Sequence, residues 1–86
     1  MVLRVLSFVQ DGCMACSEQA PINRSVSQAL NIPIEEIDVM KERSYIRQYR
    51  LSVTPTIVVL KKGTEVARFE GVVHNEALEE SLRKYL

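Results

Sequence analysis

The sequence is poor in residues that mark several protein classes, with only two cysteines, three glycines, three prolines and no tryptophan among its 86 residues. The low glycine and proline content argues against a fibrous or disordered chain, and 47% hydrophobic residues suit a globular core. Two cysteines exclude the multiply bridged framework of small secreted proteins. A chain this short cannot supply two cores, so we expect a single domain over residues 1–86.

An excess of charge is also absent, because eleven Lys and Arg residues balance eleven Asp and Glu residues. Since no net positive field attracts polyanions, we expect neither nucleic acid nor a membrane as a partner. The apolar run at Met1–Val9 is too short to span a bilayer, and Arg4 interrupts it. No small-residue cleavage site follows the run, so we expect no signal peptide and a cytoplasmic protein.

Four segments have the composition of β-strands, because each is rich in β-branched and apolar residues and is bounded by turn residues. They are residues 2–9, 34–39, 56–60 and 65–69. Gly63 lies in a short turn between the last two segments, which predicts a hairpin. The apolar residues of the last segment do not alternate cleanly, so we expect an irregularity in that strand.

Three segments, 16–30, 41–49 and 75–86, have apolar residues at helical spacing. Pro21 lies inside the first helix and should kink it. The order β-α-β-α-β-β-α predicts an α/β fold with a four-stranded mixed sheet and helices on both faces. We expect the inward faces to consist of Cys16, Ala20, Ile22, Val26, Ala29 and Leu30 in the first helix, of Ile46 and Tyr49 in the second, and of Leu78, Leu82, Tyr85 and Leu86 in the last.

The motif Cys13-Met14-Ala15-Cys16 lies where the first strand gives way to the first helix. Backbone N–H groups without helical partners and the helix dipole favour a thiolate on Cys13, and the thiolate is the nucleophilic form of cysteine. Cys16 lies one turn further along, on the inward face, where it can form a short-loop disulfide with Cys13. The motif therefore predicts a redox pair in which Cys13 attacks and Cys16 resolves.

Other uses of the two cysteines have less support. A zinc site needs four ligands, and His74 is the only other soft candidate, so we expect no metal and no cofactor. A purely structural disulfide is disfavoured because so small a loop constrains the unfolded chain little. His74 itself precedes the last helix, where a surface histidine needs no functional role.

Several motifs resemble the thioredoxin and glutaredoxin superfamily. They are Cys13-Met14-Ala15-Cys16, Ala20-Pro21-Ile22, the segment 49–56, Gly63 and Gly71. The resemblance covers nearly the whole chain, although the first strand and helix of thioredoxins have no counterpart and the length is closer to that of a glutaredoxin. It implies a thioredoxin-like fold and a redox-active disulfide between Cys13 and Cys16.

The resemblance also implies a cis Thr54–Pro55 peptide bond that packs against the two sulfurs and turns the Thr54 backbone toward an extended substrate. A cis-proline there would shield the cysteines from metal. The apolar side chains of Met14, Val53, Val72 and Val73 indicate a docking surface for a protein partner, and the alternative for any one of them is a place in the core. The predicted substrate-binding residues are Gly12, Met14, Val53, Thr54, Pro55, Gly71 and Val72.

The chain departs from both families at several positions. Ser7 stands where thioredoxins have a buried aspartate, and because a hydroxyl is no carboxylate base, water or an unidentified side chain must accept the proton of the resolving thiol. Met14-Ala15 replaces the Gly-Pro of thioredoxins and the Pro-Tyr of glutaredoxins. The Gly-Gly and Asp cluster that holds the glutathione carboxylate has no counterpart near Gly71, so glutathione is not a predicted ligand.

The sequence therefore predicts a monomeric thiol–disulfide oxidoreductase that reduces disulfide-containing proteins. Its electron donor would be a thioredoxin-reductase-like enzyme or a glutathione-based system. Two alternatives remain open at this point. One is a glutathione-dependent, glutaredoxin-like enzyme, and the other is a non-enzymatic thioredoxin-fold module that binds a partner or carries a metal or cluster on the same cysteines.

Overall fold

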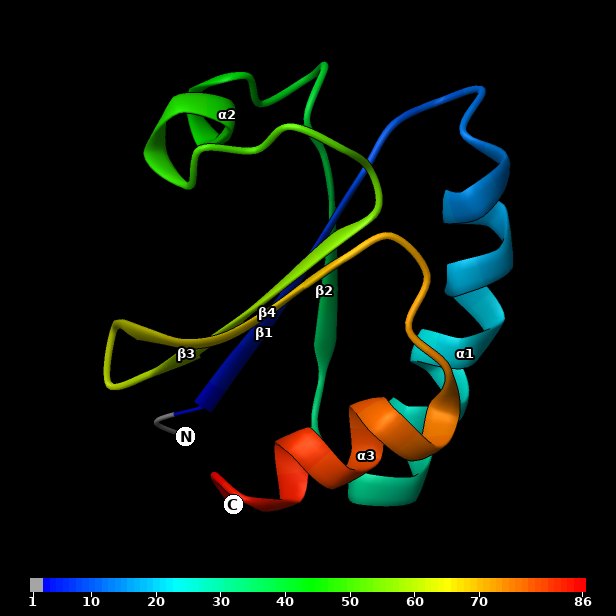
Figure 1. Cartoon of the computed structure of the whole chain (residues 1–86), viewed down its shortest axis with the longest axis vertical. Coiled ribbons are helices and arrows are strands. Elements are labelled where there is room, and N and C mark those ends of the chain that lie inside the picture. The colour runs from blue at the N-terminus through cyan, green and yellow to red at the C-terminus, as the bar shows by residue number, and fades with distance from the viewer. Residues whose placement is uncertain (1–2) are drawn as a thin grey trace.

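The computed structural model describes residues 3–86, so Val2, the expected first residue of the first strand, lies outside the described residues. Strands and helices alternate in the predicted order β-α-β-α-β-β-α (Figure 1). They are β1 (Leu3–Val9), α1 (Met14–Leu30), β2 (Ile34–Asp38), α2 (Ser44–Gln48), β3 (Thr56–Lys61), β4 (Thr64–Glu70) and α3 (Asn75–Arg83). Within residues 3–86, no helix has both the length and the apolar character needed to cross a bilayer.

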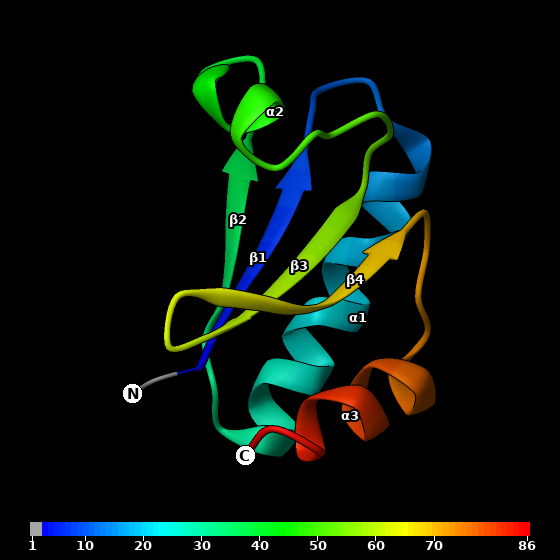
Figure 2. The same ribbon diagram turned by 60° about the vertical axis from the view of Figure 1, so that its left-hand side comes forward.

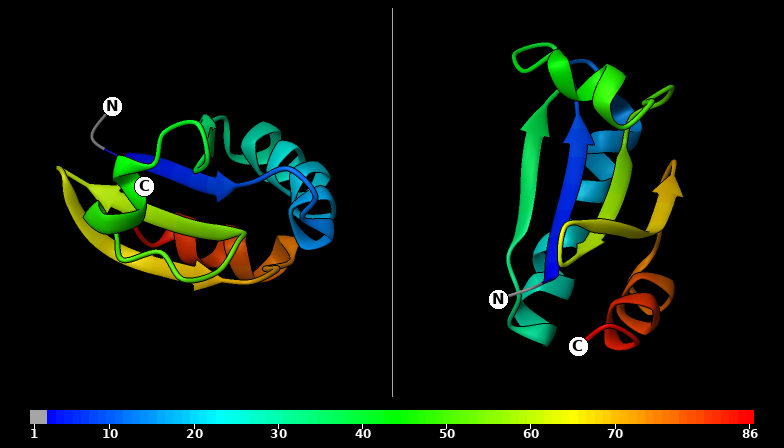
Figure 3. Two further views of the ribbon diagram at one scale, coloured as in Figure 1. Left: turned by 90° about the horizontal axis from the view of Figure 1, so that it is seen from above. Right: turned by 90° about the vertical axis from the view of Figure 1, so that its left-hand side faces the viewer.

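The four strands form one mixed sheet in the order β2-β1-β3-β4, as the right-hand view of Figure 3 shows. β1 and β2 are parallel, because α1 carries the chain back along the sheet between them. β3 pairs antiparallel with both β1 and β4. This topology confirms the predicted α/β class and the thioredoxin-like arrangement of elements.

The register of the strands brings three chain connections to one end of the sheet. Phe8 near the end of β1 pairs with Thr56, the first residue of β3, and Thr56 pairs with Glu70, the last residue of β4. The chain that leaves β1, the chain that enters β3 and the chain that leaves β4 therefore lie side by side (Figure 2). These three connections carry the residues that the sequence singles out for chemistry and binding.

Two apolar clusters fill the space on the two faces of the sheet. The first lies between the sheet and the helices α1 and α3, and includes Val5, Val26, Ile57, Val59, Leu78 and Leu82. The second lies between the sheet and the segment around α2, and includes Leu6, Phe8, Ile37, Val58 and Leu60 with Tyr45, Ile46 and Tyr49 packed against it. Helices on both faces and the inward positions of Ile46 and Tyr49 agree with the prediction.

The expected irregularity is a register shift in the β3–β4 pairing. Val59 pairs with Ala67 and Leu60 pairs with Glu65, which leaves Val66 without a partner on β3. The extra residue is a β-bulge, and it explains why the apolar residues of this strand do not alternate.

Two predicted helices are shorter in the structure. α2 does not begin until Ser44, because the backbone N–H groups of Lys41 and Glu42 bond to the Asp38 carbonyl and make a turn. α3 ends at Arg83, where Tyr85 N–H bonds to the Leu82 carbonyl three residues earlier. Tyr85 still packs on the core, but Leu86 is 59% exposed, so its predicted inward position was wrong.

The inward face of α1 also differs from the prediction. Cys16 and Val26 are buried as expected, and Pro21 lies inside the helix. Ala29 is exposed, and the buried positions that complete the face are polar, namely Gln19 and Asn23. The helix thus turns a partly polar face toward the sheet.

Arg68 on β4 connects the sheet to the segment that precedes β3. Its guanidinium donates to the Tyr49 carbonyl at 2.6 Å and to the Glu65 carboxylate at 2.8 Å. The hydrogen bond and the positive charge of Arg68 hold the pKa of the Glu65 carboxyl below its usual value. The Tyr49 contact fixes the start of the connection that ends at Thr54.

Phe8 provides the first test of this packing. It is fully buried, and its ring lies 5.4 Å from the Tyr45 ring and 5.5 Å from the Tyr49 ring, measured between centroids. We predict that Phe8→Ala lowers the free energy of unfolding by about 3–5 kcal/mol, because it leaves a cavity in the second cluster. Met14→Ala, at a side chain that is 88% exposed, should change it by less than about 0.5 kcal/mol. Denaturant titration measures both, and a Phe8→Ala loss below about 1 kcal/mol would contradict the assigned packing.

Candidate active site

Cys13 and Cys16 form a disulfide at the amino end of α1. Cys13 caps the helix with an extended backbone, Cys16 lies one turn inside it, and their Cα atoms are 5.2 Å apart. Cys13 is half-buried, whereas only 7% of Cys16 is exposed. An incoming molecule can therefore reach the Cys13 sulfur more readily than the Cys16 sulfur.

Two groups donate hydrogen bonds to the Cys13 sulfur. The Cys16 backbone N–H donates at 3.1 Å and the Thr54 hydroxyl at 3.4 Å. The Thr54 carbonyl oxygen lies 3.5 Å from the same sulfur, and this is a contact because a disulfide sulfur has no proton to donate. The two donors and the helix dipole favour negative charge on this sulfur once the disulfide opens. Cys13 is thus arranged to act as a thiolate nucleophile.

Thr54 and Pro55 lie opposite the amino end of α1. The peptide bond between them is cis, and the Pro55 side chain is almost completely buried. The Thr56 hydroxyl donates to the Val53 carbonyl at 2.7 Å, which holds the turn on the other side of the proline. The Thr54 backbone and hydroxyl are thereby kept within contact of the Cys13 sulfur.

Gly71 joins the connection after β4 to this site. Its backbone N–H donates to the Pro55 carbonyl at 2.9 Å. Its φ of +87° lies in the left-handed region that residues with a Cβ rarely adopt, so glycine permits the turn that makes this bond. The segment 71–73 therefore lies beside Pro55.

The structure gathers the predicted binding residues at one end of the sheet. Met14 is 88% exposed and Val53 is 46% exposed, so both side chains are available to another molecule. Their role in binding substrate stays a prediction. Gly12 lies in the connection after β1 and Met14 begins α1, whereas Val53, Thr54 and Pro55 precede β3 and Gly71 and Val72 follow β4.

Val73 does not belong to the exposed apolar surface on which we expected it. It is only 7% exposed, because its side chain packs in the first cluster with Ile57 and Leu78. The apolar surface is thus limited to Met14, Val53 and the half-buried Val72.

Sequence reasoning missed two polar side chains that lie beneath the site, Gln19 and Asn23. Ser7, which the sequence analysis did single out, is fully buried, and its hydroxyl accepts a hydrogen bond at 3.0 Å from the Asn23 amide. Gln19 is equally buried and contacts both Asn23 and the Val73 backbone. The sequence did contain a signal for the burial of these side chains. Gln19, Asn23 and Val26 follow Cys16 at steps of three and four residues, which places all four on one face of the helix.

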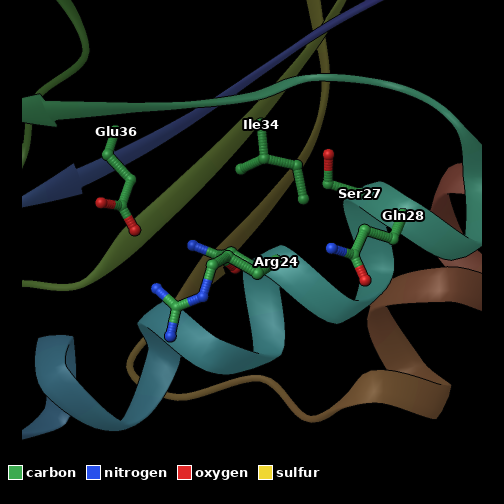
Figure 4. A pocket seen from close by; sticks show the side chains of 6 residues that line it. Arg24, Ser27, Gln28, Ile34 and Glu36 are labelled. Atoms are coloured by element: carbon green, nitrogen blue, oxygen red, sulfur yellow. The ribbon is translucent and has the colours of Figure 1, made fainter.

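Two small cavities flank the cysteines and the cis-proline. One of about 240 Å³ lies beside Cys16, and its lining includes Glu36 and Asp38. The other, about 140 Å³, adjoins Thr54 and is lined mainly by apolar side chains such as Ile46 and Leu51. A larger cavity of about 380 Å³ lies between α1 and β2 (Figure 4), and neither cysteine contributes to its lining.

His74 is the residue that caps the amino end of α3. Its side chain is 74% exposed, and its Nε2 atom is 3.9 Å from a carboxylate oxygen of Glu18. Within residues 3–86, no three His, Cys, Asp or Glu side chains are grouped closely enough to hold a metal ion.

Comparison with known proteins connects this site to one family. The family model for thioredoxin matches residues 2–84. A thioredoxin-like protein of Synechocystis is 31% identical over 84 residues, which are 95% of this chain and 80% of the relative. The thioredoxin of Chlamydia pneumoniae is 27% identical over 96% of this chain and 82% of its own length. The chain spans only 42% of the rice chloroplastic thioredoxin Y, to which it is 31% identical.

Solved structures that resemble this chain are also thioredoxins. Thioredoxin-2 of the malaria parasite superposes with a TM-score of 0.91 at 27% identity, covering 96% of this chain and 82% of that one. The thioredoxin of Fasciola hepatica superposes with a TM-score of 0.88 at 26% identity, covering 98% and 81% of the two chains.

The difference in exposure between the two cysteines predicts the order of their reaction. After reduction, brief alkylation near neutral pH should label Cys13 before Cys16, because Cys13 is half-buried and Cys16 is only 7% exposed. Peptide mass spectrometry locates the label, and denatured protein, in which both thiols react, serves as the control. Preferential labelling of Cys16 in the folded protein would reverse the assigned roles.

Proposed function

The chain belongs to the thioredoxin family, whose members are thiol–disulfide oxidoreductases, and we propose that it reduces disulfide bonds in proteins. The proposal rests on one observation above all. Cys13 and Cys16 form a disulfide in which the accessible sulfur caps a helix and the sheltered sulfur lies one turn behind it. This arrangement suits a pair that cycles between dithiol and disulfide.

The reaction begins when the Cys13 thiolate attacks one sulfur of a substrate disulfide. A bond forms between Cys13 and that sulfur, and the other substrate sulfur leaves as a thiolate that takes up a proton. Cys16 then attacks Cys13, which releases the second substrate thiol. Two electrons have passed to the substrate, and the Cys13–Cys16 disulfide is the product that remains on this chain.

The second step requires that the Cys16 thiol lose its proton. The Ser7 hydroxyl cannot accept it, because it is no base near neutral pH and already accepts a bond from Asn23. The cavity beside Cys16 gives water a path to this thiol, between the carboxylates of Glu36 and Asp38. We therefore assign the proton to water in this cavity.

The substrate would lie across the three connections that surround the Cys13 sulfur. The main chain of an extended segment would pair with the Thr54 backbone, which contacts that sulfur. Its flanking side chains would cover Gly12 and Met14 on one side and Gly71 and Val72 on the other. Val53, which is 46% exposed beside Pro55, adds apolar contact area.

The oxidised pair must be reduced again before the next cycle. We assign this step to a thioredoxin-reductase-like enzyme, because the matched family is thioredoxin and the chain lacks the Gly-Gly and Asp cluster expected of a glutathione site. Such a cycle needs a reducing compartment, which favours the cytoplasm. A single chain holds both sulfurs and all three connections, so the cycle requires only a monomer.

A trapping experiment tests this function. Cys16→Ser should accumulate a mixed disulfide between Cys13 and a protein substrate, because the resolving thiol is missing. The complex is detected as a reducible adduct on a non-reducing gel and mapped by mass spectrometry. Cys13→Ser is the matched control and should form no such adduct. Equal trapping by both variants would contradict the assignment, and the absence of an adduct from Cys16→Ser with any disulfide-containing protein would overturn the function.

A further inference from the structure

Two polar side chains of α1 are buried in the core beneath the active site. Gln19 is fully buried and Asn23 is 3% exposed. A buried amide is costly unless its donors and acceptors are paired. Among the described residues, no buried side-chain nitrogen or oxygen lacks a partner, so these amides belong to a complete network.

The network runs from the sheet to the connection after β4. The Asn23 amide donates to the Ser7 hydroxyl on β1, and the Gln19 amide donates to the Asn23 side-chain oxygen, each at 3.0 Å. The Gln19 amide also donates to the Val73 carbonyl at 3.0 Å, while its oxygen accepts from the Val73 N–H at 2.9 Å. Gln19 thus pairs with both backbone groups of Val73, as a neighbouring strand would.

These bonds complete a closed path of contacts that passes through Cys13. Thr54 contacts Cys13, and the neighbouring Pro55 carbonyl accepts from Gly71. Two residues later, Val73 is bound to Gln19, which lies on the helix that contains Cys16 and that Cys13 caps. Figures 1 and 2 show the connection from β4 to α3 passing beside α1. The Gly71–Val73 segment is therefore attached to the Pro55 turn at one end and to α1 at the other.

The network contains no group that exchanges protons near neutral pH, because Ser7, Asn23 and Gln19 are all uncharged. Its hydrogen bonds connect α1, near its amino end, to the Gly71–Val73 segment. These are two of the three borders of the surface on which a protein substrate would lie.

We propose that Gln19 is a positioning residue that holds the Gly71–Val73 segment in place for protein substrates. This inference rests on the proposed function. A protein substrate contacts Gly71 and Val72 and therefore depends on the bond between Gln19 and Val73. A small disulfide needs only access to the Cys13 sulfur, so its reduction does not depend on Gln19.

The test compares two substrates in steady-state assays with Gln19→Met, a variant of similar length that can form neither the two bonds to Val73 nor the bond to Asn23. We expect KM for a protein disulfide to rise about tenfold, in line with the loss of the bonds that hold Val73, with kcat unchanged. The rate with a small aromatic disulfide and the redox potential of the Cys13–Cys16 pair should not change. Amide exchange at Val73 should become faster.

Ser7→Ala is the matched control. It removes a buried hydrogen bond from the same network but leaves the Gln19–Val73 bonds in place. It should lower the free energy of unfolding without changing KM, which separates stability from positioning. If Gln19→Met does not fold, the triple variant Ser7→Ala, Gln19→Leu, Asn23→Leu replaces the three polar side chains of the network with apolar ones and is measured in the same way. Failure of both to fold would show that the network serves folding and would overturn the proposal.

The remaining outcomes distinguish this inference from the function on which it rests. An unchanged KM for the protein substrate in a folded variant, or an equal loss with the small disulfide, overturns the role of Gln19 alone. Wild-type protein that reduces neither substrate overturns the proposed function and the role of Gln19 with it.

Discussion

The hydrogen bonds at the first turn of α1 are the constraint on which the site depends. The Cys16 N–H donates to the Cys13 sulfur, and the Ser17 N–H donates to the Cys13 carbonyl. A cysteine therefore occupies the capping position that serine, threonine or aspartate usually fills. Because β1 ends at Val9 beside the start of β3, the sulfur that caps the helix also lies against Thr54. One residue thus completes the helix and, in the proposed function, provides the reactive atom.

The region around this sulfur combines apolar packing with a small number of buried polar contacts. Phe8 and Ile57 anchor the strands on opposite faces of the sheet, and apolar burial of this kind supplies most of the stability. The buried amides contribute little net free energy compared with apolar side chains of similar size, but they are directional. Directional contacts fix where the connections lie, and in the proposed function a protein substrate would be bound at these positions.

Much of the fold could be predicted from the sequence, because its signals are local. A few neighbouring residues are enough to predict the strand at 56–60, the hairpin at Gly63 and the start of a helix at the Cys13-to-Cys16 motif. The ends of α2 and α3 could not be predicted, because they depend on the turn at Asp38 and on the last contacts of Tyr85. Val73 appeared exposed because apolar character does not distinguish a docking surface from a core. The burial of Gln19 and Asn23 was missed because a polar side chain is expected at the surface. It can be buried only when hydrogen-bond partners are available, and here these partners, Ser7 and Val73, are distant in sequence.

The central claim is that the Cys13–Cys16 pair transfers two electrons to a disulfide in another protein. The most direct measurement mixes the fully reduced chain with an equimolar disulfide-containing protein, stops the exchange with acid and determines the intact mass of both proteins. We expect this chain to lose two hydrogens as its disulfide forms, and the substrate to gain two in equal amount at the same rate. A chain that stays in the dithiol form while the substrate disulfide remains intact, under a redox poise that permits the reaction, would contradict it.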